Sequence, residues 1–113
     1  LIKTVKICRK HKLKVGIFAS NLKEARKIKK LKPDYLIIEP PELVAGDISV
    51  SKAKPGLIKN IAKKLKTPFI VGAGIKTSED VKIAMSLGAS GIAISSAITK
   101  SKNPEKTLRK LLE

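Results

Sequence analysis

Hydrophobic residues gather in four short runs along the chain, and each run is followed by a segment with helical spacing. The runs occupy residues 14–20, 34–40, 68–74 and 91–97. Two of them are rich in isoleucine and valine, which is typical of parallel strands that are covered on both faces. The pattern therefore predicts four strands of one parallel sheet.

Helices are expected before the first run and after every run. An amphipathic segment at residues 1–12 comes first, and four later helices have start signals. A helix followed by four strand–helix units predicts an α/β fold over residues 1–113, with the helices outside the sheet. The start signals are Asn21 with Glu24, Pro55, Thr77 or Ser78, and Asn103 with Pro104.

The net charge of +16 changes the list of possible partners. A strongly basic chain raises the possibility of nucleic acid, but the lysines fall mostly on the expected outer faces of helices. The aromatic residues Phe18, Tyr35 and Phe69 leave little for base stacking, and all three lie in strand-like runs. We therefore expect a solvated basic surface and no nucleic-acid partner.

The sequence also limits which disulfides, metal sites and membrane segments the chain can have. Cys8 and His11 are the only cysteine and histidine, which excludes an internal disulfide and argues against a Cys/His metal site. The apolar runs are far shorter than the roughly 20 residues needed to cross a bilayer. We expect no metal, no membrane partner and a cytoplasmic location.

One glutamate stands in an unusual place. Glu39 ends an apolar run and is followed by Pro40 and Pro41 in the segment "LIIEPPELVAG" (36–46). Such a glutamate is ordinarily a surface ion-pair partner. Here the prolines fix the backbone behind it and remove two amide donors, which makes a stiff hinge for a long loop at residues 40–54. Long loops after parallel strands often carry function, so Glu39 is a candidate catalytic residue.

A glycine turn and two serines form a second candidate site. Gly72 and Gly74 end the run at residues 68–74, where glycine lets backbone amides approach a ligand closely. The helix that follows is expected to offer unpaired amides and the positive end of its dipole, which suits phosphate. Ser95 and Ser96 end the next run and are expected to face the same anion. A tight turn and close packing of small residues are the structural alternatives.

Three segments carry a resemblance over essentially the whole chain. They are "DYLIIEPPELVAGDISVSKAKP" (34–55), "VGAGIKTSEDVKIAMSLGASGI" (71–92) and "ISSAITKSKNPEK" (94–106). In order and spacing they resemble the carboxyl-terminal half of the archaeal-type triosephosphate isomerases. The glutamate–proline–proline segment with its "VSKAKP" continuation is specific, whereas many phosphate-binding barrels share the glycine turn.

The resemblance implies a fold and a set of site residues. The fold is a (β/α)8 TIM barrel, of which this chain forms about the C-terminal half, strands five to eight with their helices, as a single partial domain. The family's base corresponds to Glu39. Substrate and phosphate contacts correspond to Val44, Gly74, Ser95 and Ser96.

The resemblance also implies the reaction. Dihydroxyacetone phosphate and glyceraldehyde 3-phosphate interconvert through an enediolate, without a cofactor, in glycolysis and gluconeogenesis. The family is itself a well-known case of a glutamate base paired with a neutral histidine and a loop that excludes water. The substrate is a small phosphorylated triose, and the full-length enzyme is expected to be a homo-oligomer, either a dimer or a tetramer.

Two stretches depart from the family pattern, and two family residues have no counterpart. Residues 44–47 read Val-Ala-Gly-Asp where the family reads Ile-Gly-Thr-Gly, and residues 95–97 read Ser-Ser-Ala where it reads Ala-Ser-Gly. The family's lysine and histidine come from earlier strands, and His11 lies at the wrong end of its helix to replace the histidine. Because a complete barrel needs about 250 residues, we expect these 113 residues to be an inactive fragment.

Two other interpretations stay open. Another phosphate-binding TIM-barrel enzyme, related to those of tryptophan or histidine biosynthesis, would share the glycine turn without needing Glu39. A non-enzymatic half-barrel that binds a polyanion would account for the charge.

Overall fold

The four predicted strands form one parallel sheet in sequence order. The computed structural model describes residues 1–44 and 46–113. Its strands pair in the order β1-β2-β3-β4, and all three pairings are parallel. The prediction of an α/β half-barrel is confirmed, and the first and last strands lie at the edges of the sheet. The strands are β1 (Gly16–Ala19), β2 (Tyr35–Ile38), β3 (Ile70–Val71) and β4 (Gly91–Ile92).

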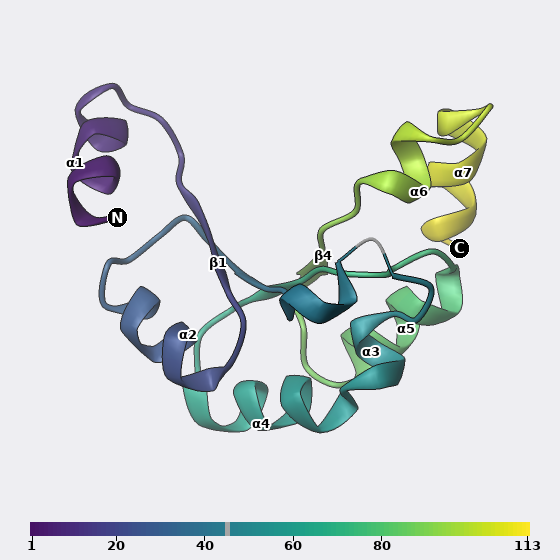
Figure 1. Ribbon diagram of the computed structural model, residues 1–113, viewed down its shortest axis with the longest axis horizontal. Helices are drawn as coiled ribbons and strands as arrows, with labels where there is room; N and C mark the ends of the chain where they lie inside the picture. The colour runs from purple at the N-terminus through teal and green to yellow at the C-terminus, as the bar shows by residue number, and fades with distance from the viewer. Residues whose placement is uncertain (45) are drawn as a thin grey trace.

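The helices follow an arc around the outside of this sheet. In Figure 1 the arc runs from α1 through α2, α4 and α5 to α6 and α7, with the strands inside it and the two termini at its ends. This arrangement is a curved sheet with helices along its convex side. The helices are α1 (Ile2–Lys10), α2 (Leu22–Lys29), α3 (Val50–Ala53), α4 (Pro55–Leu65), α5 (Ser78–Ser86), α6 (Ser96–Thr99) and α7 (Pro104–Leu111), with a 3₁₀ turn η1 (Pro41–Leu43).

The two faces of the sheet differ in burial. Alternate residues of the strands face the helices, and Ile38 and Val71 are fully buried there. On the opposite, concave face Phe18 is 54% exposed and Tyr35 is 46% exposed. The core therefore lies on the convex side only, between the sheet and the helices. Its other members include Ala25 and Ile28 of α2 and Ile58, Ile61 and Leu65 of α4.

All four strands are shorter than predicted, and the largest differences concern the last two strands and the long loop. The strands predicted at 68–74 and 91–97 are reduced to β3 and β4, because Ala73 and Gly74 have positive φ and the chain turns at Ser95 into α6. The long segment at residues 40–54 is also partly helical, with η1 near its start and α3 near its end. The last two strands therefore end several residues earlier along the chain than the apolar runs indicate.

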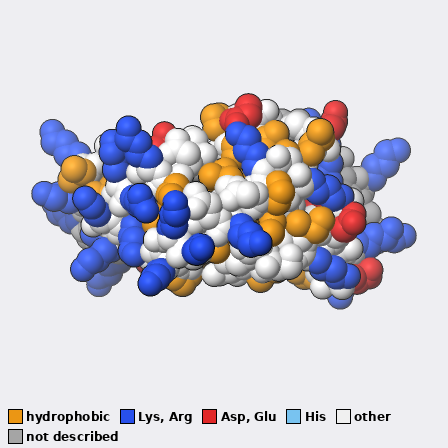
Figure 2. Space-filling model, turned by 90° about the horizontal axis from the view of Figure 1, so that it is seen from below, with side chains coloured by type: hydrophobic (Ala, Val, Ile, Leu, Met, Phe, Trp, Pro, Cys, Tyr) orange, Lys and Arg blue, Asp and Glu red, His pale blue; other side chains and the backbone are white. Residues whose placement is uncertain are grey.

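The convex surface is strongly basic. Figure 2 views the molecule from below and shows Lys and Arg side chains spread across this face. Lys27 and Lys30 of the α2 region and Lys59 and Lys63 of α4 are all exposed. In the part of the chain that the structure describes, no helix is long and apolar enough to cross a membrane.

Candidate active site

Glu39 lies directly beyond β2, at the carboxyl end of the sheet. Its backbone amide donates a hydrogen bond of 2.9 Å to the carbonyl of Ala19, which extends the β1–β2 pairing by one residue. Pro40 behind it is fully buried. The backbone of Glu39 is therefore held on both sides, while its side chain is half-buried and projects over the neighbouring strand end at Gly72.

All of the predicted site residues line one pocket of about 160 Å³. Three separate strand ends contribute to it, as expected when the carboxyl ends of parallel strands meet at one edge. A pocket of this volume has room for a small ligand, since about 10–15 Å³ of such volume already holds one water molecule. The predicted residues are Glu39, Val44, Gly74, Ser95 and Ser96, and the pocket is completed by Ala73, Ile75, Ala93 and Ile94.

Gly74 is constrained by the loop that packs on it. Its φ is +67°, and a Cβ there would lie 2.3 Å from the carbonyl oxygen of Ile48. The amide of Val50 also donates a 3.0 Å hydrogen bond to the carbonyl of Ala73, whose own φ is +78°. Residues 40–54 thus return directly onto the glycine turn. Glycine is required at this position by its positive φ and by the loop that packs against it.

Two backbone amides just before α5 are already bound to a side chain of that helix. The amides of Lys76 and Thr77 both donate to the Asp80 carboxylate at 3.0 Å. Thr77 accepts from the Asp80 amide in return, which completes a capping box. Lys76, Thr77 and Ser78 line a different pocket from Glu39. An anion in the Glu39 pocket would therefore depend on the glycine turn and the two serines.

Asp80 also joins the returning loop to α5, which the sequence reasoning missed. Ser49 Oγ donates to Asp80 Oδ1 at 3.0 Å, and Ser51 Oγ donates to the Asp80 carbonyl at 3.0 Å. Lys52 Nζ lies 3.2 Å from the same carboxylate. Burial alone would raise the pKa of Asp80, but hydrogen bonds from Lys76 N, Lys52, Ser49 and Thr77 N together lower it to about 2. The polar residues Ser49, Ser51 and Lys52 are visible in the sequence, but no pattern there pairs them with Asp80.

Two exposed ion pairs involve the loop at residues 40–54: one joins its two ends, and the other joins it to the segment before α5. Lys54 pairs with Glu42, and its hydrogen bond lowers the pKa of that carboxyl. Lys76 Nζ lies 2.9 Å from Asp47, and this hydrogen bond lowers the pKa of Asp47. Asp47 is one of the positions at which the sequence departs from the pattern that it otherwise resembles, and its contact with Lys76 joins the loop to the segment before α5. Ala45, another of these positions, lies outside the described residues.

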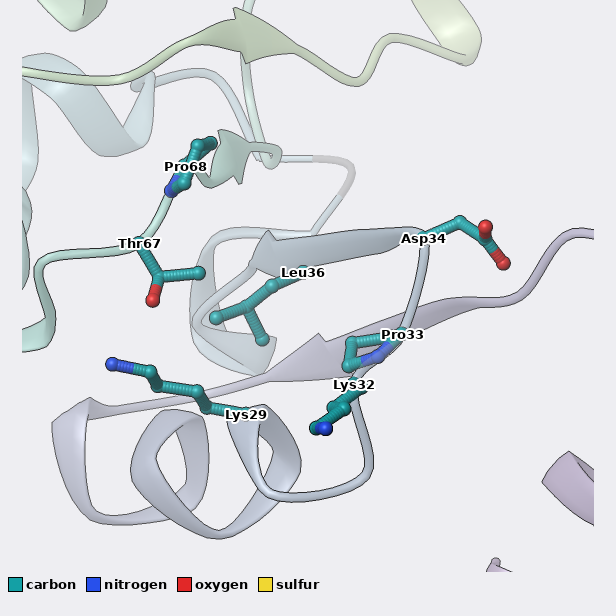
Figure 3. A pocket seen from close by; sticks show the side chains of 7 residues that line it. All are labelled: Lys29, Lys32, Pro33, Asp34, Leu36, Thr67 and Pro68. Atoms are coloured by element: carbon teal, nitrogen blue, oxygen red, sulfur yellow. The ribbon is translucent and has the colours of Figure 1, made fainter.

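A larger cavity of about 330 Å³ lies at the opposite end of the sheet. Figure 3 shows its lining: the Lys29 side chain ends near Thr67, and Leu36 of β2 lies between Thr67 and Lys32. Lys29 Nζ already donates to the carbonyl of Leu65 at 2.8 Å, and Asp34 accepts from the Val15 amide at 2.7 Å. Lys29 and Asp34 are thus already engaged in bonds to the backbone, which leaves the Glu39 pocket as the better candidate site.

No metal site emerges from the described ranges 1–44 and 46–113. They contain no group of three or more His, Cys, Asp or Glu residues that could hold an ion.

The parallel half-barrel, with a pocket at the carboxyl ends of its strands, defines the class of protein. The tryptophan synthase A-subunit from Pyrococcus furiosus superposes with a TM-score of 0.77 at 18% identity, over 97% of this chain and 49% of that chain. The family model for the thiazole biosynthesis protein ThiG matches residues 48–111. The chain thus has the fold of about half of a (β/α)8 barrel, and more than half of its length matches the ThiG family model.

Comparison with curated proteins gives matches that extend over Glu39 and the two prolines behind it. Triosephosphate isomerase from Thermoplasma volcanium is 38% identical over 100% of this chain and 54% of its own length. Triosephosphate isomerase from Methanocaldococcus jannaschii is 35% identical over 94% of this chain and 51% of its own length. The chain matches the carboxyl-terminal part of these archaeal triosephosphate isomerases. It spans about half the length of these curated relatives.

Proposed function

We propose that this chain forms the carboxyl-terminal half of a barrel that interconverts dihydroxyacetone phosphate and glyceraldehyde 3-phosphate, with Glu39 as general base. The observation that carries the proposal is the single pocket shared by Glu39, Val44, Gly74, Ser95 and Ser96. A proton-accepting carboxylate thereby lies beside small residues that suit a phosphate. The proposed setting is glycolysis or gluconeogenesis in the cytoplasm, in a homo-oligomer.

Glu39 would act on the carbon next to the carbonyl. Its carboxylate removes a proton from C1 of dihydroxyacetone phosphate, and the electrons of that bond form the enediolate. The carboxylic acid then returns the proton to C2, while a proton moves between the two oxygens, and glyceraldehyde 3-phosphate results. A lysine and a histidine that stabilise the developing charge on oxygen would come from the half of the barrel that this chain does not include.

The phosphate would bind at the opposite wall of the pocket. Gly74 contributes backbone without a side chain, and Ser95 and Ser96 contribute amides and hydroxyls. Val44 is half exposed, and its amide donates at 3.3 Å to the carbonyl of Pro41. Contact between that amide and the substrate would require this hydrogen bond to be exchanged when the loop closes.

Loop closure would occur between two fixed ends. Buried Pro40 holds the start of the loop, and Ser49 and Ser51 fix its return through Asp80. A closed loop excludes water from the enediolate, which protects this intermediate from losing its phosphate. The fixed ends confine movement to the middle of the segment.

A second candidate follows from the ThiG match. That match covers residues 48–111 and therefore omits Glu39. A different phosphate-binding barrel enzyme would use the glycine turn and the two serines but would place its reactive group elsewhere. Activity that is independent of Glu39 would favour this candidate.

The test uses a completed barrel, in which this chain replaces the matching segment of the Thermoplasma volcanium isomerase. Dihydroxyacetone phosphate in deuterated water is followed by proton NMR, which detects both product and deuterium bound to carbon. We expect conversion with deuterium incorporation, and loss of both in Glu39→Gln. Glu105→Gln is the matched control, because that exposed glutamate pairs with Arg109 of the same helix and with no other residue that the structure describes. Equal activity in the two variants would contradict the role of Glu39.

A further inference from the structure

Gly72 lies directly under the carboxylate of Glu39. A Cβ built on Gly72 would be 3.0 Å from Glu39 Oε1 and 3.6 Å from Glu39 Cδ. Gly72 follows β3 and is itself buried, and its amide donates a 2.9 Å hydrogen bond to the carbonyl of Ile38. The carboxylate therefore occupies the space that a side chain at Gly72 would fill.

The backbone gives no separate reason for glycine at this position. Gly74 and Gly88 have positive φ values of 67° and 107°, which disfavour any side chain, but Gly72 does not have a positive φ. Outside Glu39, the atom nearest to a Cβ on Gly72 would be the Ala93 Cβ, at an ordinary contact distance of 3.6 Å. Glu39 is thus the one neighbour that a small side chain would crowd.

The carboxylate cannot withdraw by moving its own backbone. The Glu39 amide is bonded to the Ala19 carbonyl, and buried Pro40 follows immediately. Any displacement must therefore be taken up by the Glu39 side chain. Restoring an ordinary contact of about 3.5 Å requires the carboxylate to retreat by about half an ångström.

We propose that Gly72 is a positioning residue for the catalytic base: the bare Cα sets the depth at which the Glu39 carboxylate lies in the pocket. The inference rests on the proposed function, since it requires Glu39 to be the base. A misplacement of 1 Å in an active site can lower a rate by about a hundredfold. A displacement of about half an ångström therefore predicts a loss of about tenfold.

Gly91 provides a matched control. It begins β4, lies on the same face of the sheet one strand away, and does not have a positive φ. A Cβ on Gly91 would meet only Ile70 Cγ1, at 3.7 Å. Gly91→Ala therefore adds the same methyl group to the same face without touching Glu39.

The experiment compares Gly72→Ala with Gly91→Ala in the completed barrel. Gly72→Ala is expected to lower kcat about tenfold, to leave KM within about twofold, and to increase the primary isotope effect with substrate deuterated at the transferred position. Gly91→Ala is expected to leave all three values unchanged. Equal kinetics in the two variants would overturn the proposal. The proposal would also be overturned if Gly72→Ala melted more than about 5 °C below Gly91→Ala, because Gly72 would then be needed for packing of the fold.

A double-mutant cycle with Glu39→Asp shows whether Gly72 acts through the carboxylate. The aspartate side chain is one methylene shorter and does not reach over Gly72. Gly72→Ala is therefore expected to cost less than twofold in the Asp background, against about tenfold with glutamate. A loss of the same size in both backgrounds would overturn the proposal. If Glu39→Asp is fully active, the proposed function fails together with this inference; if only the Gly72 effect is missing, the proposed function stands.

Discussion

Replacing Asp80 by asparagine removes the charge that joins the returning loop to the start of α5. The Asp80 side chain is 6% exposed, and its carboxylate accepts hydrogen bonds from two backbone amides and Ser49 while lying 3.2 Å from Lys52 Nζ. Asparagine offers one acceptor oxygen in place of two. At least one of these buried or part-buried donors then loses its partner, which destabilises the folded state.

The magnitude follows from the pKa of Asp80, which lies at about 2 against an ordinary value of 3.8. At about 1.36 kcal/mol per pKa unit, the folded state stabilises the ionised carboxylate by about 2 kcal/mol. Because the folded pKa is the lower one, this stabilisation is fully present above pH 3.8 and is lost as the pH falls through about 2. Asp80→Asn should therefore lower the free energy of unfolding by about 2 kcal/mol at pH 7.

Urea unfolding of the completed barrel between pH 2 and pH 7 measures both effects. Glu79→Gln is the matched control, because Glu79 is the neighbouring acid, is 72% exposed and also pairs with Lys52. The control should change stability by less than about 1 kcal/mol, as is usual for exposed pairs. The reasoning would be refuted if Asp80→Asn and Glu79→Gln had equal effects at pH 7, or if the Asp80→Asn deficit persisted undiminished at pH 2.

Three further predictions concern the site and the isolated chain. Glu39→Asp should lower kcat by orders of magnitude with KM within a few-fold, in steady-state assays of the completed barrel; an equally active variant would place the base elsewhere. Inorganic phosphate titrated into the completed barrel should shift the amide NMR signals of Gly74, Ser95 and Ser96 together, and shifts confined to exposed lysines would mean loose ionic binding instead. The isolated chain should self-associate in sedimentation experiments and show no isomerase activity, because Phe18 and the free edges of the sheet are exposed; a stable monomer with salt-sensitive RNA binding would favour the polyanion alternative.

Local patterns were enough to predict the elements that frame the site. An apolar run ending in Glu39, with two prolines behind it, indicated a strand end and a fixed loop start, and the structure has β2 ending at Ile38 and Pro40 buried. Asn21 and Thr77 cap α2 and α5 as their positions indicated. These features depend on residues close together in the sequence, which is why a pattern reveals them.

Contacts between distant segments could not be predicted in the same way. The apolar run at 68–74 hides the turn made by Ala73 and Gly74, whose positive φ values accompany packing against Ile48. The Ser49–Asp80 hydrogen bond joins residues 31 positions apart. Hydrophobic periodicity carries no information about such pairs, so the network that fixes the loop emerged only from the fold.

The most direct test of the central claim is to mix this chain with the amino-terminal half of the Thermoplasma volcanium isomerase and to measure isomerisation of glyceraldehyde 3-phosphate. Neither half should be active alone, because Glu39 and the proposed lysine and histidine lie on different halves. The account predicts that activity appears on mixing and disappears when the added chain carries Glu39→Ala. Activity that survives Glu39→Ala, or a folded complex of the two halves that is inert, would contradict it.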